Sequence, residues 1–172
     1  MMQSAISQSV LPLNADGSVY HLCLRPEDIA KTIILVGDPE RVPKVSRHFS
    51  SIEVTKHNRE FVTHTGILSG QRVSVVSTGI GTSNIDIVLN ELDALYNIDF
   101  ATRCIKSDIT TLDIIRLGTC GALQEHIEPD ALLISRYAAG FDGGLCFYNQ
   151  PIEAHIQSFY AAVQMQFSRL PM

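Results

Sequence analysis

The sequence predicts an α/β fold built around a parallel or mixed sheet. Short apolar runs of strand length alternate along the chain with stretches whose apolar residues recur at helical spacing. Three of the strand-like runs lead into turns that contain glycine. With 172 residues, of which 45% are hydrophobic and 18% charged, the chain is long enough to bury the core of one ordinary domain.

The N-terminal segment shows no clear strand or helix pattern. It ends in the turn-forming sequence Asn14-Ala-Asp-Gly17. We therefore expect residues 1–18 to form a loose arm and residues 19–172 to form a single domain that is incomplete at its C-terminus.

The first buried strand is expected at Thr32–Val36, where the residues are β-branched or apolar. Gly37 follows it directly, and a helix is expected from there to about Phe49. Asp38 can cap this helix, and Pro39 suits its first turn.

A hairpin is expected next. Phe61–Leu68 and Arg72–Ser77 have the composition of strands, and the turn between them contains glycine. After Thr78-Gly-Ile-Gly81, the apolar residues of Ile85–Leu95 recur at helical spacing, so we expect a helix that begins at a glycine-rich turn.

The remaining elements follow the same alternation. Ile114–Leu117 is a candidate strand that leads to Gly118-Thr-Cys-Gly121, and Ala131–Ser135 is a candidate strand after it. Ile156–Phe167 has the pattern of a helix.

Composition excludes several classes of function. The net charge of −5, with scattered Lys and Arg, argues against nucleic acid or an anionic membrane as a partner. No signal peptide or membrane span is evident, so we expect a cytoplasmic protein. The cysteines lie far apart without a C-x-x-C pair, which favours reduced thiols over zinc or redox chemistry. They are Cys23, Cys104, Cys120 and Cys146.

The glycine-bearing turns predict an anion site. Ligands of α/β sheets bind at the carboxyl ends of strands, where glycine allows close approach of the backbone and helix N-termini favour anions. Arg41 and Arg116 accompany two of these turns, and Thr119 adds a hydroxyl donor. Taken singly, each motif is better explained by a surface or ion-paired arginine beside a tight turn, so the prediction of an anion site depends on the motifs together. The fingerprints of ATP and NAD sites are not matched.

Five short motifs in the same order resemble the nucleoside phosphorylases, in particular uridine phosphorylase and its relatives. They are Val36-Gly-Asp-Pro-Glu-Arg-Val42, Asn58-Arg-Glu-Phe61, Ser77-Thr-Gly-Ile-Gly81, Asn90-Glu-Leu92 and Arg116-Leu-Gly-Thr-Cys-Gly-Ala122. The resemblance covers roughly residues 19–144. It implies a three-layer α/β/α fold with a central mixed sheet, truncated in this chain, since no counterpart is recognisable after about Gln150.

The resemblance also implies roles for individual residues. Inorganic phosphate would be held by Gly37, Arg41, Arg116 and Thr119, of which Arg116 and Thr119 would also be catalytic. Arg59 would reach the phosphate of a neighbouring subunit's site, and His21 would contact the ribose 5′-hydroxyl across the same interface. Cys120 and Gly121 would line the base pocket.

No cofactor is implied apart from phosphate as co-substrate and K⁺ as a monovalent cation. In relatives a carboxylate matching Glu60, a carbonyl matching Ile80 and a hydroxyl after the glycine turn can hold that cation between subunits. Asn84 stands where the hydroxyl is expected, which weighs against a complete cation site.

The implied activity is phosphorolysis of uridine to uracil and ribose 1-phosphate, in nucleoside salvage or catabolism, by a glycosyltransferase of the pentosyltransferase kind. The partners would be nucleoside, phosphate and further copies of the chain, from dimer to hexamer. A purine nucleoside phosphorylase, a nucleosidase and a catalytically dead phosphate-binding fragment are the alternatives. The Glu-Met-Glu segment for ribose and the Gln/Arg pair for the pyrimidine are not found in the sequence.

Overall fold

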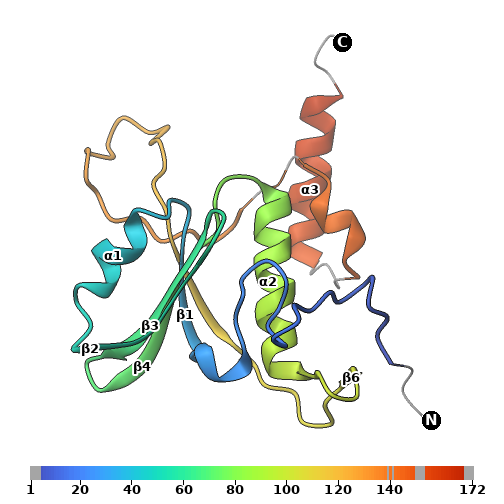
Figure 1. Ribbon diagram of the computed structural model, residues 1–172. Helices are drawn as coiled ribbons and strands as arrows, with labels where there is room; N and C mark the ends of the chain where they lie inside the picture. The colour runs from blue at the N-terminus through green and yellow to red at the C-terminus, as the bar shows by residue number, and fades with distance from the viewer. Residues whose placement is uncertain (1–4, 139, 141, 150–153, 169–172) are drawn as a thin grey trace. The chain divides into compact units, whose positions relative to one another are not determined.

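A mixed sheet of five strands, in the order β2-β3-β4-β1-β7, organises the first part of the computed structural model (Figure 1). Its strands are β1 Thr32–Val36, β2 Ser51–Asn58, β3 Phe61–Leu68, β4 Gln71–Ser77 and β7 Asp113–Leu117. The structure describes residues 5–138, 140, 142–149 and 154–168. These residues fall into two compact units, Met1–Leu132 and Leu133–Met172.

The first unit holds the sheet with the short helix α1 and the long helix α2. Its remaining elements are η1 Pro26–Asp28, α1 Arg41–Ser46, α2 Thr82–Asn97, β5 Ile98–Asp99 and β6 Cys104–Ile105. The second unit contains η2 Gly144–Phe147 and α3 Ala154–Phe167. None of the helices in the described segments is long and apolar enough to cross a membrane.

Strand pairing brings three chain turns to one edge of the sheet. β1 lies between β4 and β7 and pairs with both in parallel, while β2, β3 and β4 are antiparallel. The last residue of β1, Val36, pairs with Ser77 on one side and Leu117 on the other. The three glycine-bearing turns that follow these strands are therefore neighbours in space, as the sequence predicts.

The two helices cover opposite faces of the sheet. In β1, alternate side chains point to opposite faces. Ile33 and Leu35 join the apolar cluster that includes residues of α2, whereas Val36 packs with Val42 of α1. The predicted three-layer α/β/α arrangement with a mixed central sheet is confirmed.

Most predicted elements are present, with corrections at α1. The helix after Gly37 ends at Ser46 and not near Phe49. Its N-cap residue is Glu40, without a side-chain capping bond, and Asp38 instead accepts a hydrogen bond from the Glu40 amide. Asp38 therefore shapes the turn before the helix.

Besides the short pair β5 and β6, which was not predicted, two strand assignments differ from the sequence-based expectation. β2 was not predicted, because its residues are mostly polar and it forms an edge strand defined by its pairing with β3. The prediction of a strand at Ala131–Ser135 is wrong, since these residues make no ladder with any described strand. Leu132 and Ile134 are both 93% exposed. An apolar run needs a partner strand to satisfy its backbone hydrogen bonds.

Specific contacts hold the arm that was expected to be loose. The Arg103 side chain donates hydrogen bonds to the carbonyls of Ile6, Ser7 and Leu11. Leu11 is buried, and Leu13 forms an isolated bridge with Val19. Arg103 thus anchors the N-terminal segment. The contact joins residues more than 90 positions apart, so the local sequence pattern does not reveal it.

A contact of the half-buried His64 links α1 to the sheet and predicts a pH dependence of stability. The buried Ser46 hydroxyl lies 2.7 Å from Nδ1 of His64 on β3, and burial lowers the pKa of His64 below its ordinary value of 6.5. Below that value the unfolded chain binds a proton that the folded chain resists, so stability must fall as pH falls. We expect the free energy of unfolding to decrease between about pH 7 and about pH 5.

His64→Gln should flatten this dependence, whereas His126→Gln, at an exposed position, should leave it unchanged. Chemical denaturation of the three proteins at several pH values measures the slopes. An identical slope in the His64 variant would contradict the expectation.

Candidate active site

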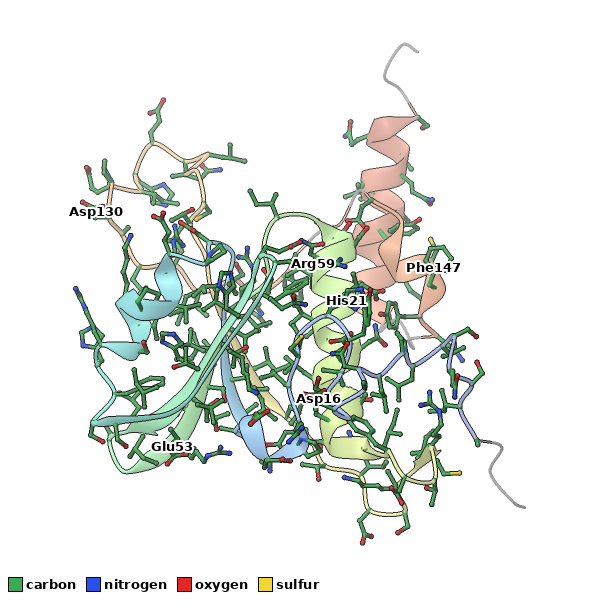
Figure 2. The ribbon with its side chains drawn as sticks, in the orientation of Figure 1. Asp16, His21, Glu53, Arg59, Asp130 and Phe147 are labelled. Carbon is green, nitrogen blue, oxygen red and sulfur yellow. The ribbon has the colours of Figure 1, made fainter. Side chains whose placement is uncertain are left out.

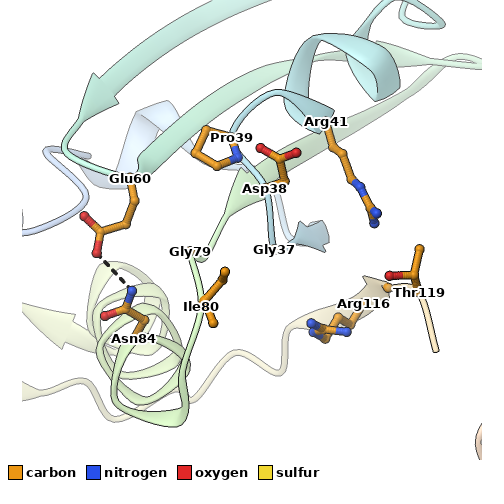
Figure 3. Close-up of a pocket in the computed structure, with 11 residues that line it drawn as sticks. Gly37, Asp38, Pro39, Arg41, Glu60, Gly79, Ile80, Asn84, Arg116 and Thr119 are labelled. Atoms are coloured by element: carbon orange, nitrogen blue, oxygen red, sulfur yellow. Dashed lines mark hydrogen bonds between the residues drawn. The ribbon is translucent and has the colours of Figure 1, made fainter. Parts of the chain in front are cut away.

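A pocket of about 580 Å³ lies where β1, β4 and β7 end (Figure 3). All of its lining residues belong to the first unit. They are Gly37, Asp38, Pro39, Arg41, Glu60, Gly79, Ile80, Asn84, Arg116, Gly118 and Thr119. The turns after all three parallel strands contribute, as expected for a ligand site at the carboxyl ends of strands.

The guanidinium group of Arg116 spans the gap between two of these turns. A Cβ atom added to Gly118 would collide with Nη1 of Arg116, and one added to Gly37 would lie 3.9 Å from Nη2. Arg116 is the penultimate residue of β7, and its side chain folds back over the glycine that follows the strand. Glycine at position 118 therefore leaves the space that this guanidinium occupies.

Arg41 reaches the pocket from the opposite turn. It is the first residue of α1, and its amide donates to the Asp38 carbonyl at 3.0 Å, which fixes the start of the helix. Figure 3 shows its side chain pointing from α1 toward the end of β7, where Arg116 and Thr119 lie. Two cations and a hydroxyl donor from elements far apart in sequence thus line one pocket.

Both guanidinium groups are available to an external anion. Within the described part of the chain, neither Arg41 nor Arg116 makes an ion pair or side-chain hydrogen bond. The Asp38 carboxylate accepts from the backbone of Glu40 at 2.9 Å. Forked guanidinium donors match the oxygens of phosphate in charge and geometry. The arrangement suits an oxyanion, and the alternative that these arginines serve internal ion pairs finds no support.

The other end of the pocket carries a carboxylate and an amide. Asn84 donates through Nδ2 to Oε1 of Glu60 at 2.9 Å, as drawn in Figure 3. Both side chains pack over Gly79, whose φ is +68° and where an added Cβ would lie 2.7 Å from Asn84 Nδ2. The described residues contain no group of three or more His, Cys, Asp or Glu side chains arranged for a metal ion. A monovalent cation at Glu60 stays a prediction, and Asn84 already supplies a hydrogen-bond donor to that carboxylate.

His21 and Arg59 lie together but are not among the residues that line the pocket of this chain. Arg59 is exposed in the turn between β2 and β3, with φ of 55°, and its Cζ lies 5.9 Å from the centre of the Tyr20 ring. The Tyr20 and His21 rings meet edge to face at 4.9 Å. Figure 2 shows the labelled His21 and Arg59 close to each other. We call Tyr20, His21 and Arg59 the His21 cluster.

Sequence reasoning missed the residue that holds His21. Glu91, on α2, is only 7% exposed, and its Oε1 lies 2.7 Å from Nδ1 of His21. Asn58 donates to the His21 carbonyl at 2.8 Å. Both belong to motifs of the resemblance, but neither was given a role. The available signal was a carboxylate at helical spacing from Val88 and Leu95, on the apolar side of α2.

Cys120 and Gly121 follow the pocket residues without joining them. Cys120 is exposed, and an added Cβ on Gly121 would meet no atom within 4 Å. Their assignment to a base pocket remains a prediction.

Comparison with known proteins identifies the family. The family model described as "Phosphorylase superfamily" matches residues 31–168. The uridine phosphorylase of Thermococcus kodakarensis is 36% identical over 77% of this chain and 43% of its own length. That of Treponema pallidum is 39% identical over 72% of this chain and 43% of its own length. A DeoD-type purine nucleoside phosphorylase of Alkaliphilus metalliredigens is 33% identical over 69% of this chain and 46% of its own.

Solved structures agree with this relation. A Trypanosoma brucei nucleoside phosphorylase, described as showing uridine phosphorylase activity, matches with a TM-score of 0.82 and 36% identity, covering 91% of this chain and 54% of that one. A uridine phosphorylase of Phytophthora capsici matches with a TM-score of 0.58 and 32% identity, over 73% of this chain and 40% of that one.

This chain spans about half the length of these relatives. The family match contains the strand ends and turns that line the pocket. It continues to residue 168, which corrects the expectation that no counterpart follows Gln150. The chain therefore belongs to the phosphorylase superfamily, and the resemblance to nucleoside phosphorylases of the uridine phosphorylase type is confirmed.

Proposed function

We propose that this chain carries the phosphate site of a cytoplasmic nucleoside phosphorylase that cleaves pyrimidine nucleosides, with uridine as the substrate. The observation that supports this most is the convergence of Arg41 and Arg116, free of internal ion pairs in the described chain, at the shared end of three parallel strands. Gly37 and Thr119 complete the proposed set of groups around the phosphate.

The proposed reaction places phosphate as nucleophile at C1′ of the nucleoside. A phosphate oxygen forms a bond to C1′ while the bond from C1′ to the base nitrogen breaks, and the base leaves with that electron pair. Arg41 and Arg116 hold the dianion against the positive charge that develops on the sugar, and the Thr119 hydroxyl donates to a phosphate oxygen. No nucleophile from the protein is needed, which agrees with the position of Cys120 outside the pocket lining.

A pocket with two unpaired arginines favours phosphorolysis over hydrolysis. If water were the attacking group, no anion would bind next to the two arginines, and their charges would stay without a partner. The names of the relatives support a nucleoside substrate, with uridine phosphorylases and purine enzymes both among them. We place the pyrimidine reaction first because the uridine enzymes resemble this chain at 36% and 39% identity.

The His21 cluster completes the site of a neighbouring subunit in this proposal. Arg59 would reach the neighbour's phosphate, and His21 would reach the 5′-hydroxyl of the neighbour's ribose. The clustering of both residues apart from the pocket of their own chain supports this arrangement. It requires a homo-oligomer, with a two-fold dimer as its smallest form.

The reaction is tested by following uridine cleavage by absorbance with and without phosphate. We expect cleavage only with phosphate. Arg116→Ala should raise the KM for phosphate roughly 10- to 100-fold, since a hydrogen bond to a charged group is worth about 1.5–3 kcal/mol. Lys44→Ala, an exposed position of α1 outside the pocket, is the matched control.

Cleavage without phosphate would replace the proposal with a nucleosidase. Cleavage of inosine but not uridine would replace the pyrimidine with a purine substrate. A melting temperature raised by phosphate without any product would mark a phosphate-binding fragment.

The shared site is tested by mixing two variants, each impaired in phosphate binding, at a phosphate concentration too low for either variant alone to be active. In a dimer of Arg59→Ala with Arg116→Ala, one site keeps the Arg116 of one subunit and the Arg59 of the other, while the second site loses both. Random exchange should therefore restore about a quarter of the wild-type sites in an equal mixture. Activity of the mixture, measured after subunit exchange, checks this. If both arginines acted within one subunit, no site would be restored.

A further inference from the structure

The buried carboxylate of Glu91 lies outside the pocket, and both of its oxygens accept hydrogen bonds. Its side chain is 9% exposed and lies on the apolar side of α2. Oε2 accepts the amide of Leu22 at 2.9 Å, and the amide of His21 lies 3.0 Å from Oε1 and 3.1 Å from Oε2. A carboxylate at such a position costs stability unless it is satisfied in this way.

These contacts decide where the imidazole of His21 carries its hydrogen. An ionised carboxylate can only accept hydrogen bonds, and both oxygens of Glu91 already accept from backbone amides. In the 2.7 Å contact between Oε1 and Nδ1 the hydrogen therefore belongs to Nδ1. The neutral ring then carries its lone pair on Nε2.

The surroundings hold the ring in one orientation. Tyr20 meets it edge to face at 4.9 Å with planes at 90°, and Phe61 at 6.4 Å with planes at 79°. The Asn58 side chain donates a hydrogen bond to the His21 carbonyl and so fixes the backbone of His21. The His21 side chain is 24% exposed, and among the residues that the structure describes none forms a hydrogen bond with Nε2. A single acceptor nitrogen is thus available to a ligand.

We infer that Glu91 is a positioning residue that selects a free hydroxyl at the 5′ position of the substrate. By keeping His21 in the Nδ1–H form, Glu91 leaves Nε2 as an acceptor, which pairs with a hydroxyl donor. A phosphate monoester is largely a dianion at neutral pH and has only acceptor oxygens to offer. The inference rests on the proposed function, in which His21 reaches the sugar bound by the neighbouring subunit. It assigns Glu91 the discrimination of nucleosides from nucleotides.

The hydrogen position is tested directly by NMR on the wild-type chain labelled with ¹⁵N in histidine. Long-range ¹H–¹⁵N correlations distinguish the two neutral forms, and loss of one set of signals in His21→Asn assigns the residue. We expect a hydrogen on Nδ1 and a bare Nε2. His64, which contacts Ser46, serves as internal reference. A hydrogen on Nε2 of His21 at neutral pH, whether the ring is neutral or doubly protonated, would overturn the inference, whatever activity the protein has.

Glu91→Gln tests the consequence, because its amide can donate to Nδ1 and move the ring hydrogen to Nε2. We expect the ratio of kcat/KM for uridine over uridine 5′-monophosphate to fall about 3- to 10-fold, the worth of one ordinary hydrogen bond. A merely structural role of Glu91 would lower both values equally and leave the ratio unchanged, which would contradict the inference. Asp93→Asn, at an exposed position of the same helix, is the control.

The two tests separate the inference from the proposed function. Absence of uridine cleavage by the wild-type protein would count against the proposed reaction, while the NMR measurement would still decide the state of His21.

Discussion

The parallel pairing of β1 with both β4 and β7 is the constraint on which the site depends. Because Val36 lies in register with Ser77 and Leu117, the chain leaves the sheet three times at the same edge. Each exit is followed by a turn with glycine, so backbone and side chains can approach one another closely there. A shift of one strand by a single residue would reverse the faces of its side chains and separate the turns.

This geometry also determines which charged groups of the pocket have partners within the chain. Asp38 is engaged by the backbone at the start of α1, and Glu60 by Asn84 at the far end. Both arginines are left without a carboxylate partner in the described chain, although they lie in the same pocket. The two positive charges repel each other. An anion bound between them is attracted to both, so the electrostatic energy then favours binding.

The sequence predicts those parts of the structure that local pattern determines. The apolar runs of β1, β3, β4 and β7 and the helical spacing in α2 are local, and the rule that parallel strands end at a common edge then brings Arg41 and Arg116 together. The contact between Glu91 and His21 spans 70 residues, so local pattern shows only that position 91 faces the core. β2 and Ala131–Ser135 were misjudged because a strand needs a partner, and partners are not visible in a local window.

Two surfaces of the chain take part in the proposed function: the pocket, which would bind phosphate, and the His21 cluster, which would serve a neighbouring subunit. Both depend on an oxyanion that binds between Arg41 and Arg116. Diffraction from crystals soaked in arsenate, at a wavelength where arsenic scatters anomalously, locates the anion directly. We expect an anomalous peak within hydrogen-bonding distance of both guanidinium groups and the Thr119 hydroxyl. An empty pocket beside an arsenate bound elsewhere would contradict this expectation.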